Sequence, residues 1–285
     1  MLDAVSAETA KLLRHKATWF LVWAYPIAMV TVFAIALLLD LFGIGPEQSG
    51  EPQSAEGWIG DTAVIWQLAT SSFGRFLIAA YAAVAFAGEY GWNTWKLIVP
   101  HRSRPALLGA KYVTVFCLLF GAFAVTGLLT AGLSWAEDRI TGDSVPAGVT
   151  LAAVLEMQGR AALATVVPLL FTIAYASLAA NLTRSMMAAL AISFVLGTFE
   201  QLFTAWAGIL YPYAPGLIGP LYYLLPGYHI ANLIDWLIEG QGMAVPLLGA
   251  EGAALPWQVS LAAAGGWTVA LIAIAIWRFR RQDIN

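Results

Sequence analysis

Cysteine and charge are both scarce in this sequence. Its 285 residues include one cysteine, Cys117, so an internal disulfide and any metal site built from several cysteines are excluded. Charged residues make up only 11% of the chain, whereas a soluble domain usually carries about 25%. Hydrophobic residues make up 60%. This balance predicts a polytopic membrane protein.

The common motifs of nucleotide binding and hydrolysis are also absent. There is no GxxxxGK[ST] loop and no Rossmann glycine fingerprint, so the chain is not expected to bind ATP by itself. His15, His101 and His229 lie in separate regions, which argues against a histidine metal centre. The few basic residues lie close to apolar runs, so they suit lipid headgroups or an acidic protein better than nucleic acid. We therefore expect no catalytic residue, cofactor or metal in this chain.

What the sequence has instead is a series of apolar runs spread from end to end. Six of them approach the ~20 residues that a helix needs to cross a bilayer. They predict one all-α membrane domain over residues 1–285, with Pro26 and Pro168 as possible kinks. The approximate limits of the six spans are 17–42, 64–88, 112–135, 159–180, 187–211 and 257–278.

Residues 217–238 are apolar enough to pass as a seventh span. They also contain Pro226, His229 and Asp235, and polar groups are costly at the centre of a bilayer unless they line a cavity. A seventh span would also separate the C-terminal arginines from the other basic loops. We therefore predict that the segment 212–256 holds re-entrant or interfacial helices on one face.

Charges divide unevenly between the two faces that six spans create. One face receives both chain ends, residues 88–111 and the turn at Arg184, with 11 basic and 4 acidic residues. The other receives 2 basic and 12 acidic residues. Lys and Arg concentrate on the cytoplasmic side of membrane proteins. Both termini are therefore predicted to be cytoplasmic, and residues 43–63 and 212–256 external.

Two charged residues, Arg75 and Glu200, lie inside predicted spans. Each is 13 residues from the predicted cytoplasmic end of its span, which is about 20 Å at 1.5 Å per residue. Opposite charges at one depth predict a pair between the second and fifth spans. Such a pair either has a structural role, each charge neutralising the other, or forms part of a translocation pathway.

The stretch 88–111 is the longest polar and basic interruption between two spans. It mixes Lys and Arg with tryptophan and aliphatic residues, which is typical of a short amphipathic helix at a membrane surface. The alternative is an ordinary positively charged loop. Residues 1–16 contain a basic cluster before the first span, and they predict a second interfacial helix in preference to a cleaved signal peptide.

Residues 88–111 resemble the cytoplasmic segment of ABC-2 permeases, the membrane subunits of one class of ATP-binding-cassette exporter. That family typically has a Glu after the second span, then a small residue and Thr, a few apolar residues, a Pro, a Ser-Arg pair and a Lys entering the third span. Here Asn93 replaces the small residue, and one extra residue separates the Pro from the Ser. The matching positions are Glu89, Thr94, Leu97, Ile98, Pro100, Ser103, Arg104 and Lys111.

The resemblance implies a bacterial cytoplasmic-membrane subunit that pairs with a second copy of itself. It also implies two copies of a cytoplasmic ABC ATPase, which would hold ATP and Mg²⁺. Residues 1–16 become an elbow helix, residues 88–111 a coupling-helix loop, and the second and fifth spans part of the pathway. The residues expected to couple to the ATPase are Glu89, Tyr90, Trp92, Thr94, Trp95, Lys96 and Arg104.

The favoured function is therefore an export permease. Its expected cargo is hydrophobic or amphipathic, such as a peptide antibiotic, a drug or a lipid-like molecule. One alternative is an intramembrane enzyme, for which only Arg75 and Glu200 qualify as paired groups at one depth. The other alternative is a membrane anchor of an assembly complex, which would have a similar sequence.

Overall fold

Helices form nearly all of the regular structure in the described part of the chain. The computed structural model describes residues 2–44, 54–91, 94–98, 102–142, 144–245, 247 and 253–282, and these contain no strand. The prediction of an all-α membrane protein is confirmed at this level. That residues 1–285 form one domain stays a prediction.

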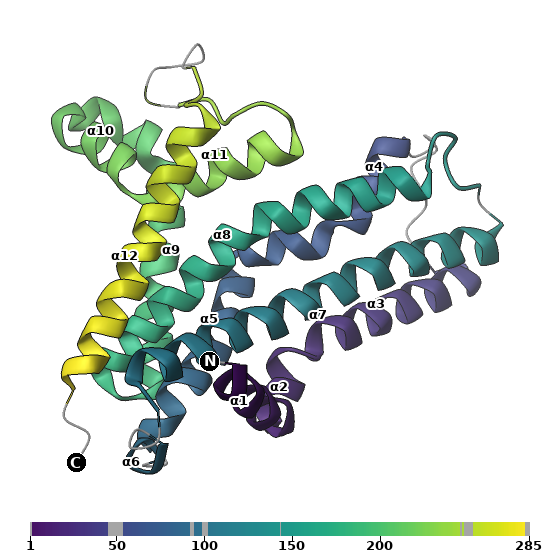
Figure 1. Ribbon diagram of the computed structural model, residues 1–285. Helices are drawn as coiled ribbons and strands as arrows, with labels where there is room; N and C mark the ends of the chain where they lie inside the picture. The colour runs from purple at the N-terminus through teal and green to yellow at the C-terminus, as the bar shows by residue number, and fades with distance from the viewer. Residues whose placement is uncertain are drawn as a thin grey trace.

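Five helical segments are long and apolar enough to cross a bilayer, and they match five of the six predicted spans (Figure 1). Most extend several residues beyond the predicted limits, because polar residues at the span ends continue the helical hydrogen bonding. The count of six spans is not confirmed. The five segments are α3 (Ala24–Leu41), α7 (Arg104–Thr141), α8 (Leu151–Thr183), Met186–Tyr213, which includes α9 (Met186–Leu210), and α12 (Trp257–Arg281).

The predicted span 64–88 is wrong as a single helix. It consists of a 3₁₀ helix, η1 (Val64–Ala69), followed by α5 (Ser72–Gly91), with a turn between them. The turn brings Gly74 so close to the backbone carbonyl of Leu68 that a Cβ atom at Gly74 would overlap it. Polar and charged residues lower the hydropathy of α5. α5 packs against α8, α9 and α7, so much of its surface is buried by other helices.

The predicted span 17–42 is also divided. It becomes α2 (Lys16–Leu21) and α3, and the chain bends between them at Val22 and Trp23. Pro26 lies in the first turn of α3, where the missing N–H of proline is tolerated, so it does not kink the middle of a span. α8 continues through Pro168 without ending.

The N-terminal interfacial prediction corresponds to α1 (Leu2–Arg14), which packs against α7. Figure 1 places α1, the short helix α6 (Trp95–Ile98) and the last turn of α12 at the same end of the molecule. The charge distribution predicts this grouping. Which side of the membrane this end faces stays a prediction.

The segment 212–256 contributes two short helices at the opposite end, α10 (Pro215–Leu224) and α11 (Pro226–Ile238) (Figure 1). Neither is long enough to be a seventh span. Two polar residues of this segment, His229 and Asn232, are buried with partners: His229 Nε2 is 2.8 Å from the Tyr223 carbonyl oxygen, and Asn232 Nδ2 donates to Ser260 Oγ at 2.8 Å, whereas Asp235 is partly exposed. Re-entry into the bilayer stays a prediction.

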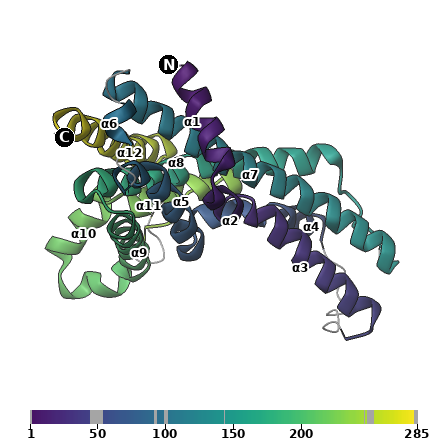
Figure 2. The same ribbon diagram turned by 90° about the horizontal axis from the view of Figure 1, so that it is seen from below.

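The helices form two wings around α5 and α8. Seen from below, α9, α10 and α12 lie on one side and α3, α4 (Ala55–Thr62) and α7 on the other (Figure 2). α8 packs against α5, α7, α9, α11 and α12. The central position of α5 and α8 puts the predicted pathway residue Arg75 inside the protein.

Candidate functional site

A buried ionic cluster occupies the end of the molecule where α6 lies. We call Glu8, Lys11, Glu89, Thr94 and Lys111 the Glu89 cluster. Lys111 Nζ lies 3.0 Å from Glu89 Oε1 and 2.9 Å from Glu8 Oε1, and Lys11 forms an ion pair with both carboxylates. The Thr94 hydroxyl donates to Glu89 Oε2, and the Thr94 N–H donates to the Glu89 carbonyl at 3.0 Å. The cluster joins α1, α5, α7 and the residue before α6.

The Glu89 carboxylate lies just beyond the predicted second span, and its side chain is 3% exposed. Burial by itself raises the pKa of this group. The charges of Lys111 and Lys11 and the hydrogen bond from Thr94 outweigh burial and lower the pKa of Glu89 to about 2. Glu89 is therefore ionised at neutral pH and holds two lysines and a threonine in place.

Aromatic contacts attach α6 to the C-terminal helix. Trp95 is buried, its ring centroid lies 4.5 Å from that of Phe279, and Lys111 Nζ is 5.3 Å from the centroid of the Trp95 ring. The Tyr90 hydroxyl contacts Asn181 Oδ1 at 3.0 Å and Gln282 Oε1 at 2.6 Å. The end of α5, α6 and the end of α12 are thus held together.

The structure divides the predicted coupling residues by exposure. Glu89 and Trp95 are buried, so in this conformation they cannot touch a partner protein and instead fix the position of α6. Tyr90, Thr94 and Arg104 are partly exposed, and Arg104 donates to backbone carbonyls of Phe279, Arg280 and Gln282. Lys96 is exposed. Trp92, and Pro100 of the family pattern, lie outside the described residues.

Arg75 and Glu200 are brought together between α5 and α9. Arg75 Nη1 lies 4.0 Å from Glu200 Oε2 and donates to the Gly197 carbonyl at 3.2 Å. Both side chains are buried, and the Tyr175 hydroxyl donates to the other oxygen of Glu200. Arg75 Nε and Glu200 Oε2 have no hydrogen-bond partner among the described residues. The ion pair is therefore long, and each side chain keeps one polar atom without a hydrogen-bond partner among the described residues.

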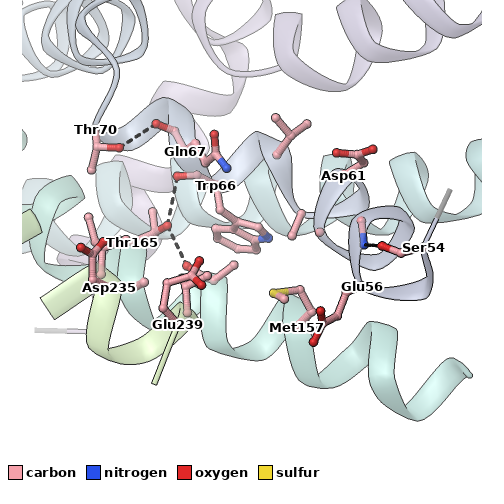
Figure 3. A pocket seen from close by; sticks show the side chains of 18 residues that line it. Ser54, Glu56, Asp61, Trp66, Gln67, Thr70, Met157, Thr165, Asp235 and Glu239 are labelled. Carbon is pink, nitrogen blue, oxygen red and sulfur yellow. Dashed lines mark hydrogen bonds between the residues drawn. The ribbon is translucent and has the colours of Figure 1, made fainter. Parts of the chain in front are cut away.

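A cavity of about 820 Å³ lies between α4, η1, α8 and α11 (Figure 3). A smaller cavity of about 360 Å³ includes Arg75 and Gln201 in its lining, and the two cavities share Thr70, Ile234 and Asp235. The two cavities are therefore adjacent, and the smaller one is lined by the predicted pathway residue Arg75. The polar residues that line the larger cavity are Ser54, Glu56, Asp61, Gln67, Thr70, Thr165, Asp235 and Glu239.

The sequence interpretation missed several of these partners. Glu8 and Lys11 lie far from Glu89 along the chain, and so does Phe279 from Trp95. Tyr175, which contacts Glu200, lies within an apolar run that does not indicate this contact. No local signal in the sequence indicates that Asp235 and Glu239, four residues apart, line a cavity.

These features define a class of protein: a multi-pass helical membrane protein with a polar cavity between its helices and a largely buried ionic cluster at one end. Residues 4–200, from α1 to the middle of α9, match the family described as ABC-2 family transporter protein. The chain belongs to this family, which confirms the resemblance seen in residues 88–111. A comparison with curated proteins gives no match.

Membership in the ABC-2 family makes the chain a permease-type membrane subunit of an ABC transporter. Such subunits are generally not enzymes, and an assembly of this type includes an ATPase partner. The family match ends at Glu200, so α10, α11 and α12 lie outside it.

Proposed function

We propose that the chain is the permease of an ABC exporter, and that a separate cytoplasmic ATPase docks at the end carrying α6. The observation that supports this most strongly is the Glu89 cluster. It ties the residue preceding α6 to α1, α5 and α7 through buried ion pairs and hydrogen bonds. A push on α6 is therefore passed to three helices together.

A movement of α6 would reach the cavity through α5. Glu89 and Arg75 lie on the same helix, α5, 14 residues apart, which is about 21 Å along the axis. A rigid-body shift of α5 moves Arg75 relative to Glu200 on α9, because the contact between them is loose at 4.0 Å. ATP-driven closure of the ATPase would in this way change the shape of the cavity.

Membership in the family supports the remaining parts of the proposal. Two copies of the chain and two copies of the ATPase form the exporter, ATP and Mg²⁺ are held by the ATPase, and lipids of a bacterial cytoplasmic membrane surround the spans. The cargo is hydrophobic or amphipathic and moves outward. An intramembrane enzyme would work without the ATPase, and an assembly anchor would bind it without ATP-driven transport.

Lys96 provides the test of docking, because it is exposed on α6 and makes no contact within the Glu89 cluster. Lys96→Glu is expected to reduce the amount of P-loop ATPase that co-purifies with the tagged chain from native membranes by about ten-fold, since charge reversal at an interface is unfavourable. The ATPase is identified and quantified by mass spectrometry.

Lys16→Glu is the matched control, because Lys16 is an exposed lysine at the start of α2, close in sequence to α1. It should leave the amount of ATPase unchanged. Recovery of no ATPase with the unmodified chain, or equal recovery with the Lys96 and unmodified chains, would refute docking at α6.

A further inference from the structure

The larger cavity has an acidic lining that is open to solvent at Glu56, Asp61 and Glu239. Asp235 and Glu239 lie four residues apart, Asp235 on α11 and Glu239 at its C-terminal cap, and α4 contributes Glu56 and Asp61. Figure 3 shows the carboxylates of Asp235 and Glu239 on one side of the cavity and those of Glu56 and Asp61 toward its other end. No lysine or arginine is among its lining residues in the described part of the chain. The lining therefore favours a cation.

Burial and the charge of Glu239 both raise the pKa of Asp235 above its ordinary value. The part of this rise that comes from Glu239 is a repulsion between the two carboxylates. A positive group placed between them would relieve that repulsion.

The same cavity has an apolar side. Trp66, Met157, Ala161, Ile234 and Ile238 are among its lining residues. Its volume of about 820 Å³ lies within the roughly 300–1,000 Å³ range of pockets that enclose drug-sized ligands. A long folded peptide would not fit whole, whereas a single alkyl chain or ring system with a polar head would.

An independent observation comes from the smaller cavity. Arg75 is among its lining residues, is only 6% exposed, and its Nε–H has no hydrogen-bond partner among the described residues. Buried polar groups are rarely left without a partner, because the lost hydrogen bond to water is not replaced. Thr70 and Asp235 line both cavities, so a ligand bound in the larger one can extend toward this donor. The unpartnered Nε–H therefore favours a ligand that carries an acceptor oxygen in addition to its positive charge.

We propose that the joined cavities bind a small cationic amphiphile that carries a hydrogen-bond acceptor. Its ammonium group lies beside Asp235 and Glu239, its apolar part lies along Trp66 and Met157, and its acceptor oxygen receives the Arg75 Nε–H. If the proposed export function is correct, this is the cargo class, but binding itself does not depend on the ATPase.

The test measures saturable binding to the purified chain in lipid nanodiscs, with empty nanodiscs subtracted. The probe is tritiated N-(3-aminopropyl)dodecanamide, which has a primary ammonium, an amide oxygen and one alkyl chain. Two competitors separate its parts: the N-acetylated form, which lacks the positive charge, and dodecylamine, which lacks the amide oxygen. The probe is expected to bind at least about ten-fold more tightly than the acetylated form, because only the charged head meets the carboxylates.

Two variants locate the site. The double variant Asp235→Asn with Glu239→Gln should weaken probe binding by about ten-fold or more, while Asp40→Asn, an acidic residue of α3 that does not line the cavity, should not. Arg75→Lys keeps the charge but removes Nε, so it should weaken binding of the amide probe and leave dodecylamine binding unchanged. Folding of each variant is checked by its thermal transition.

Equal affinity for the probe and its acetylated form would overturn the proposal. So would unchanged binding to a folded Asp235/Glu239 variant. Failure of the proposed function looks different: the probe would bind as described, but no ATPase would co-purify with the chain.

Discussion

Glu89→Ala is expected to lower the thermal stability of the purified protein sharply and to abolish co-purification of the ATPase. Lys111 has a side chain that is 2% exposed, and it would lose one of its two carboxylate partners. Removing one member of a buried ion pair typically costs about 3–5 kcal/mol, because the remaining charge stays buried. The Thr94 hydroxyl would lose its acceptor as well, so α6 would be released from α5. Thermal unfolding in nanodiscs and quantitative mass spectrometry provide the two measurements.

The control for this stability effect is Glu156→Ala. Glu156 pairs with Arg160 across one helical turn, and both side chains are about half or more exposed. Pairs of this kind contribute about 0.3–0.5 kcal/mol, so the thermal transition should move little. A Glu89 variant that unfolds like the Glu156 variant would contradict the central role given to the cluster.

A double replacement separates stability from coupling. Glu89→Met combined with Lys111→Met removes one charge of each sign and leaves Glu8 paired with Lys11. We expect stability to recover substantially, because no buried charge is left without a partner. ATPase recovery should stay low, because Thr94 still lacks its acceptor. Recovery of both properties would mean that Glu89 stabilises the fold without transmitting movement.

The second large effect is expected at Arg75 and Glu200. Arg75→Met or Glu200→Met alone should destabilise the protein by about 3–5 kcal/mol, since each leaves one charge buried opposite an apolar group. The double variant should be close to the unmodified protein in stability, because replacing a buried ion pair by apolar residues is often neutral. A double-mutant cycle on thermal unfolding measures this coupling.

Transport distinguishes the structural role of this pair from a pathway role. If Arg75 and Glu200 only neutralise one another, the stable double variant should retain ATP-driven transport in proteoliposomes. We expect transport to fall, because Arg75 lines the smaller cavity and holds an unused donor there. If the double variant loses as much stability as the two single variants added together, the two side chains are not coupled.

Composition and apolar periodicity predicted much of this fold. Five of six predicted spans correspond to long apolar helices, because the length and hydropathy of a spanning helix are local properties of the sequence. The exception is informative. α5 has a turn before Ser72 and carries Arg75, so its position among other helices depends on packing against α8 and α9 that no local pattern reveals.

The candidate site was only partly predictable for a similar reason. The family pattern identified Glu89, Thr94 and Lys111, and the structure places all three in one cluster. It could not indicate that Glu89 faces inward, because its partner Lys11 is 78 positions away and comes from a separate helix. The cavity is formed by α4, η1, α8 and α11 together, so no local sequence pattern marks Asp235 and Glu239 as lining residues.

The central claim is that the end carrying α6 is the docking face for the ATPase, and site-specific photocrosslinking tests it most directly. A photoreactive amino acid replaces Lys96 in one sample and Tyr213, which is 85% exposed next to α10, in another. We predict a crosslink to a P-loop ATPase from position 96 and none from position 213. A crosslink from position 213, or none from position 96 in membranes that contain the assembled transporter, would contradict the account.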